Sequence, residues 1–96
     1  MALKLNDFDP ARYLDDDEAI CDYLEAILEE DDAGLLAAAL GDIAKARGMS
    51  EIARESGISR EALYKVLRAD AQPRFDTIRS VLGALGLKIT IHPVHH

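Results

Sequence analysis

Apolar residues recur at three- and four-residue spacing in the first third of the chain. The members of this stripe are Ile20, Tyr23, Leu24, Ile27 and Leu28. Such spacing places side chains on one face of an amphipathic helix, which we expect to run to about Glu30. The acidic run at 15–18 suits the start of that helix, where free amides and the positive end of the dipole favour carboxylates.

A second apolar stripe predicts another helix, with Asp31 or Asp32 as its N-cap. Its members are Leu35, Leu36, Ala39, Leu40, Ile43 and Ala44. Gly48 follows Lys45 and Arg47, which is typical of a helix end.

The second half of the chain predicts three shorter helices, at about 50–56, 59–67 and 75–85. The segment 69–74 reads as a loop, and residues 3–14 as an extended arm or short turn. The sequence Leu-Lys-Ile-Thr-Ile-His at 87–92 alternates in polarity and is rich in β-branched residues, which predicts a short strand. We therefore expect an all-α fold with a strand near the C-terminus.

Residues 49–67 fit two short helices that cross at a steep angle. Ala53 is small where the two backbones approach, and Gly57 accepts the strained turn between them. Ile58 fills the gap, and Ser59 caps the second helix. The residues that pack the helices together are Ile52, Leu63 and Val66. This agreement at every position predicts a helix-turn-helix motif.

The outer face of the second helix carries Arg60, Glu61, Tyr64 and Lys65. In such a motif this helix enters the major groove of DNA. Arg60 can donate hydrogen bonds to guanine, and Glu61 can accept one from cytosine. Lys65 can contact a phosphate, and Tyr64 offers an aromatic ring with a hydroxyl donor. Further candidates for backbone contacts are Ser59, Arg47, Arg54, Arg68 and Arg74. The alternative is that Arg60 and Lys65 are solvated surface charges.

Charge is divided unevenly along the chain. Residues 1–42 hold thirteen Asp and Glu against two Lys and Arg, whereas residues 43–96 hold five against nine. The net charge of −7 therefore conceals a basic second half. Two halves of opposite charge favour two different partners, one of them a polyanion. The alternative is that the acidic helices are ordinary solvated surfaces.

Three segments carry a family resemblance, FDPARYLDDDEAICDYL, GMSEIARESGISREALYKVL and FDTIRSVLGALGLK. From residue 8 to about 88 the chain resembles the HigA-like addiction-module antidotes, which are antitoxins with a Cro/C1-type DNA-binding domain. The resemblance implies five helices, repression of a two-gene operon, and binding of a RelE-like toxin that cleaves mRNA. The ending IHPVHH departs from the pattern, and the loop ADAQPRF is less regular than the family predicts.

The expected organisation is an acidic arm and helix at 1–32, a helix-turn-helix domain at 33–86, and a strand and tail at 87–96. The acidic part suits a basic toxin surface that would otherwise hold RNA. Since a lone strand is unstable, residues 87–92 need a partner, for which we expect the same strand of a second subunit. The edge of the toxin's sheet is the alternative.

No pattern predicts an enzyme, a cofactor or a metal. Cys21, the single cysteine, reads as a small core residue, and His92, His95 and His96 read as a tail. The acidic run lacks the spacing of a calcium loop. A chain of 96 residues with no apolar run of membrane length and no secretory pattern predicts one cytoplasmic domain.

Three functions remain open at this point: an antitoxin that represses its own operon, a stand-alone Cro/C1-type regulator, and a protein-interaction module that has lost DNA binding. All three require the same helix-turn-helix shape.

Overall fold

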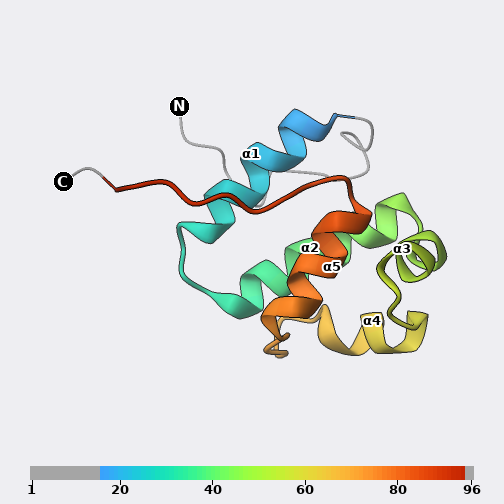
Figure 1. Cartoon of the computed structure of the whole chain (residues 1–96). Coiled ribbons are helices and arrows are strands. Elements are labelled where there is room, and N and C mark those ends of the chain that lie inside the picture. Colours follow the sequence, from blue (N-terminus) through green and yellow to red (C-terminus); the bar gives the residue numbers. More distant parts are fainter. Residues whose placement is uncertain (1–15, 95–96) are drawn as a thin grey trace.

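The computed structural model describes residues 16–94, and this part of the chain is all-helical, with five helices and no strand (Figure 1). The helices are α1 (Asp17–Leu28), α2 (Ala33–Arg47), α3 (Met49–Ser56), α4 (Arg60–Val66) and α5 (Phe75–Ala84). The predicted number, order and approximate bounds of the helices are confirmed. The expected arm at 3–14 lies outside the described residues.

Three helices begin at side-chain caps. Asp16, Asp32 and Ser59 each accept a hydrogen bond from the amide three residues further on, at 3.0–3.1 Å. Of the two candidates before α2, Asp32 is therefore the cap, and Asp31 instead occupies the turn with a φ of 53°. Each cap satisfies an amide that the helix itself leaves free, which fixes where the helix starts.

A single residue, Gly48, joins α2 to α3. It ends α2, with its amide donating to the carbonyl of Ala44 at 2.9 Å, and its own carbonyl accepts from Ile52 at 3.1 Å in α3. Its φ of 116° lies outside the range that other residues adopt easily. The direction of α3 relative to α2 is thus set within one residue.

The core lies around α2, which contacts α1, α3 and α4, while α5 packs on α3 (Figure 1). The largest side chains with almost no exposed surface are Ile20, Ile27, Leu40, Ile43, Ile52, Leu63 and Val81. Most lie on the predicted stripes. Burial of this apolar surface is the main force that holds five short helices together.

Two glycines of α2 lie directly against the chain that follows α4. A Cβ at position 41 would lie 2.6 Å from the carbonyl oxygen of Leu67, and one at position 34 would collide with the carbonyl of Ala69. Since real Cβ atoms do not approach an oxygen so closely, only glycine permits this packing. The close approach fixes the position of α4 on α2.

The strand expected at 87–92 is absent. The segment from Leu87 onward runs as an extended chain along α1 (Figure 1), beside a groove of about 280 Å³ that Leu24 and Leu28 also line. Leu87 donates its amide to the carbonyl of Leu82 at 2.9 Å, and the backbone of 88–94 forms no hydrogen bond within the described part of the chain. A strand requires a ladder of backbone bonds, and residues 16–94 of one copy supply no second strand here.

Within residues 16–94, no helix has both the length and the apolar character needed to cross a membrane.

Candidate nucleic-acid interface

The turn between α3 and α4 has the predicted geometry. Gly57 adopts the left-handed conformation, with φ 76° and ψ 12°, and its amide donates to the carbonyl of Ala53 at 3.1 Å. The hydroxyl of Ser56 donates to the same carbonyl at 3.3 Å and accepts from the amide of Ile58, also at 3.3 Å. The turn is therefore closed by hydrogen bonds as well as by the permissive glycine.

The inner side of α4 is apolar. Leu63 is fully buried, and Ile58 and Val66 are half-buried against the core together with Ala53 of α3. With these positions fixed inward, the rotation of α4 about its axis is fixed as well. The opposite side of the helix must face solvent.

The outer side of α4 presents the four side chains predicted to lie there: Arg60, Glu61, Tyr64 and Lys65. All are exposed, and Tyr64 as a whole residue is 41% exposed. Ser59 is exposed too, although its hydroxyl oxygen already serves as the helix cap. The face therefore offers two cations, one carboxylate and one aromatic ring, which is the chemistry that base edges and phosphates accept.

The ring of Tyr64 lies close to two cations from different helices. The guanidinium carbon of Arg60, on α4 itself, is 5.5 Å from the ring centre. The ammonium nitrogen of Lys45, from the last turn of α2, is 5.9 Å from the same point. Both distances fall within the range of cation–π attraction. Sequence reasoning missed Lys45 as a site residue because nineteen positions separate it from Tyr64 and no spacing rule relates α2 to α4.

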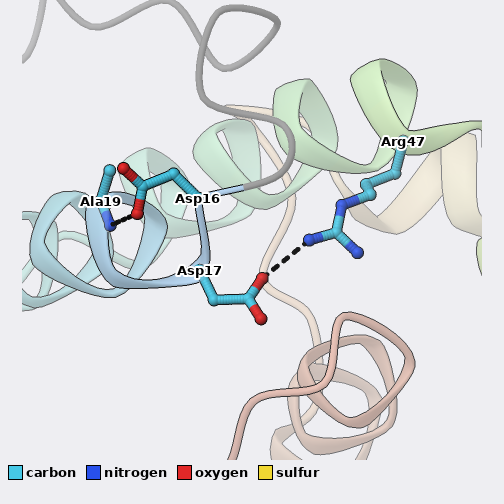
Figure 2. Close-up of polar contacts among 4 residues, drawn as sticks. All are labelled: Asp16, Asp17, Ala19 and Arg47. Carbon is cyan, nitrogen blue, oxygen red and sulfur yellow. Dashed lines mark hydrogen bonds and ion pairs between the residues drawn. The ribbon is translucent and has the colours of Figure 1, made fainter.

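Three of the arginines expected near DNA form ion pairs. Arg47 pairs with Asp17 at 3.0 Å (Figure 2), Arg68 with Asp70 at 3.2 Å, and Arg74 with Asp76 at 3.5 Å.

The exposure of each ion pair indicates how available its arginine is to contact the DNA backbone. The pairs of Arg68 and Arg74 are more than half exposed on both sides, so they are weak and exchangeable. The side chain of Arg47 is only 27% exposed and joins α2 to α1, which makes it the least available of the candidates. Arg54 lies exposed on α3.

The acidic helix α1 lies on the other side of the molecule from α4, whereas the acidic turn after α1 lies beside residues 69–72, which follow α4. In Figure 1, α2 and α5 lie between α1 and α4. The exposed carboxylates of α1 and the following turn are Asp17, Glu18, Asp22, Glu25, Glu29, Glu30, Asp31 and Asp32. The carboxylates of α1 are thus separated in space from the cations of α4.

Cys21 and Tyr23 lie within this acidic part. Burial raises the pKa of the Cys21 thiol, and the nearby carboxylates of Glu25 and Asp17 raise it further. Burial also raises the pKa of the Tyr23 phenol, with a smaller effect from Asp42. Both groups are therefore kept neutral, and a thiol in this state is a poor nucleophile. Among residues 16–94, no group of three or more His, Cys, Asp and Glu is placed to hold a metal ion.

Comparison with known proteins gives two matches of similar extent. A family model described as "probable addiction module antidote protein" matches residues 4–93. An uncharacterized protein of Haemophilus influenzae (strain ATCC 51907 / DSM 11121 / KW20 / Rd) is 50% identical over 91 residues, which cover 95% of this chain and 94% of the relative. No solved structure matches significantly. Since the family model covers nearly the whole chain, including all five described helices, the chain belongs to the family of probable addiction module antidote proteins.

Proposed function

We propose that the chain is a HigA-like antitoxin that neutralises a RelE-like, mRNA-cleaving toxin and represses its own operon by binding DNA as a homodimer. The family supports the antidote role in general, since an antidote implies a toxin. The observation that carries the DNA-binding role is the outward face of α4, which is held in place by Gly57 and by the Ser59 cap.

In this proposal the helix-turn-helix domain is of the Cro/C1 type, and α4 lies in the major groove. Arg60 donates to a guanine, and Glu61 accepts from a cytosine. Tyr64 covers a base with its ring, and Lys65 holds a phosphate. The other phosphate contacts come from Ser59, Arg54, Arg68 and Arg74. Arg68 and Arg74 exchange their exposed carboxylate partners for phosphate when DNA binds.

The toxin partner fits the acidic side of the molecule. A protein that cleaves RNA has a basic surface, and the exposed carboxylates of α1 complement such a surface in charge. Since α2 and α5 separate α1 from α4, toxin and DNA have separate surfaces to bind (Figure 1). The antitoxin then represses its operon while it holds the toxin.

The homodimer forms through the C-terminal segment. The backbone of 88–94 has free donors and acceptors within the described part of the chain, and Ile91 is 94% exposed. An antiparallel pair with the same segment of a second copy supplies the missing ladder and covers the isoleucines. Two subunits also present two copies of α4 to two half-sites of an operator.

Binding to a labelled duplex from upstream of the coding frame tests the DNA-binding role. We expect Arg60→Gln to weaken binding to this duplex by about 1–3 kcal/mol and to reduce its preference over a scrambled duplex. Arg79→Gln removes the same charge from α5 and serves as the control. Equal losses for the two variants would show that α4 does not read bases.

Co-expression with the neighbouring reading frame tests the antidote role. Rescue of growth and co-purification of a basic partner are the expected results. DNA binding without a partner would favour a stand-alone regulator. Capture of the partner without DNA binding would favour an interaction module.

A further inference from the structure

Lys45 differs from the arginines near the proposed interface. Within residues 16–94, Arg47, Arg68 and Arg74 each have a carboxylate within 4 Å, whereas Lys45 and Arg60 have no such partner. Both are instead directed to the ring of Tyr64, at 5.9 Å and 5.5 Å from its centre. Two cations from separate helices therefore gather at one exposed aromatic side chain, although the chain has a large excess of acidic residues.

Two unneutralised cations near one ring also repel each other. The ring quadrupole offsets part of this repulsion, and an anion placed beside the cations removes the rest. Lys45 is not on α4 but at the end of α2, beside the helix that enters the groove. A group in that position faces the backbone that borders a groove, and an ammonium suits a phosphate because it is a compact charge without directional preference.

We propose that Lys45 binds a DNA backbone phosphate and acts with Arg60 across the ring of Tyr64. This inference rests on the proposed DNA-binding function and extends it to a residue outside the helix-turn-helix motif. Tyr64 is the positioning residue, since its ring holds the Arg60 guanidinium beside α4 and the Lys45 ammonium beside α2. The contact fixes the rotation of α4 in the groove by attaching the end of α2 to the adjacent backbone.

The inference is tested by titrating the full chain into two labelled duplexes of equal length. One duplex comes from upstream of the coding frame, and the other is scrambled. The slope of log K against log salt concentration is measured for the wild type, Lys45→Gln and Arg79→Gln. Arg79 is an exposed cation of α5 outside the residues proposed to contact DNA or the second subunit, so its variant has the same net charge. We expect Lys45→Gln to reduce the slope by about 1.8, since each subunit of the proposed dimer loses one phosphate contact worth about 0.9, and to weaken both duplexes by the same factor. Arg79→Gln should leave the slope unchanged.

Equal slopes for Lys45→Gln, Arg79→Gln and the wild type would overturn the inference and leave the DNA-binding function standing. If the wild type binds neither duplex at low salt, both fail together.

The role of the ring is tested separately. Tyr64→Phe keeps the aromatic face, so it should retain more of the preference for the upstream duplex than Tyr64→Leu does. Equal losses of preference in these two variants would overturn the positioning role.

Discussion

The guanidinium of Arg47 donates a hydrogen bond to the carboxylate of Asp17 at 3.0 Å, which joins the end of α2 to the first turn of α1 (Figure 2). The two residues are thirty positions apart, and they link the acidic helix to the helix on which the core is built. The carboxylate also lies where the α1 dipole favours negative charge.

Asp17→Asn should therefore destabilise the fold only slightly. Since the Asp17 side chain is 67% exposed, we expect a loss of less than about 1 kcal/mol in the free energy of unfolding, which salt should reduce further. Urea unfolding at low and high salt measures the effect. Asp22→Asn, an exposed change on the same helix, is the control. An equal loss of stability at low and high salt would contradict the expectation that the pair is a weak, screened surface ion pair.

Gly57→Ala and Gly83→Ala form a matched pair with opposite expected signs. Gly57 is left-handed, so an added Cβ should cost about 1–2 kcal/mol of stability. Gly83 lies exposed inside α5 with open space around it, so the same change should add about 0.5–1 kcal/mol. Thermal unfolding of both variants measures the difference. A neutral Gly57→Ala would contradict the turn geometry.

Gly41→Ala tests the packing of α4 on α2. The new methyl group meets the carbonyl oxygen of Leu67, so the chain after α4 must move, at an expected loss of about 1–3 kcal/mol. Because α4 moves with it, affinity for the upstream duplex should fall even at temperatures where the variant is fully folded. Denaturant unfolding and duplex titration of the same sample separate the two effects. Unchanged stability would show that the approach of α2 and Leu67 is looser than the structure has it.

Charged residues in the C-terminal segment should prevent dimer formation. Ile89 and Ile91 are 44% and 94% exposed, and the double change Ile89→Asp, Ile91→Asp places two carboxylates at the proposed subunit pair. We expect a monomer in sedimentation experiments. Phe75→Asp makes the same kind of change at a 65% exposed position of α5 and should remain dimeric. A double variant that stays dimeric would exclude this segment as the subunit contact.

Stability should fall at alkaline pH. The pKa of the Cys21 thiol is raised in the folded chain, mainly by burial, so the folded chain keeps a proton that the unfolded chain releases. The free energy of unfolding should therefore decrease as pH rises from about 8 toward 11, with the Tyr23 phenol, also raised, adding at the upper end. Cys21→Ala should show a shallower decrease than the wild type in unfolding experiments across this range. If stability decreases equally in the wild type and in Cys21→Ala, ionisation of the Cys21 thiol is not the cause of the decrease.

The helices and their caps could be predicted because they depend on local sequence. The hydroxyl of Ser59 finds its amide three residues away, and Gly57 needs no distant contact to adopt a left-handed turn. The inward position of Leu63 and the outward position of Arg60 then follow from helical periodicity. The part of the candidate site that lies on α4 could therefore be predicted from the sequence.

The contacts between distant helices could not be predicted in this way. Lys45 reaches Tyr64 only because Gly41 lets the chain at Leu67 lie against α2, and no spacing in the sequence expresses that approach. Arg47 was expected near DNA, but its partner lies on α1. The prediction of a strand at 87–92 was wrong for this single chain because alternation reports which faces are apolar and does not provide a partner strand.

The one-residue joint at Gly48 determines where the chain tolerates a change in length. An added residue there would extend a helix by about 1.5 Å and turn everything beyond it by about 100°. The helices α3, α4 and α5 would then lose their orientation relative to α1 and α2. Residues 72–74, which come after the close contact of Ala69 with α2, lead to α5 without a helix of their own and contain no such joint. Relatives that differ in length should therefore carry their insertions after α4, and peptide tags or reporter sequences are best inserted there.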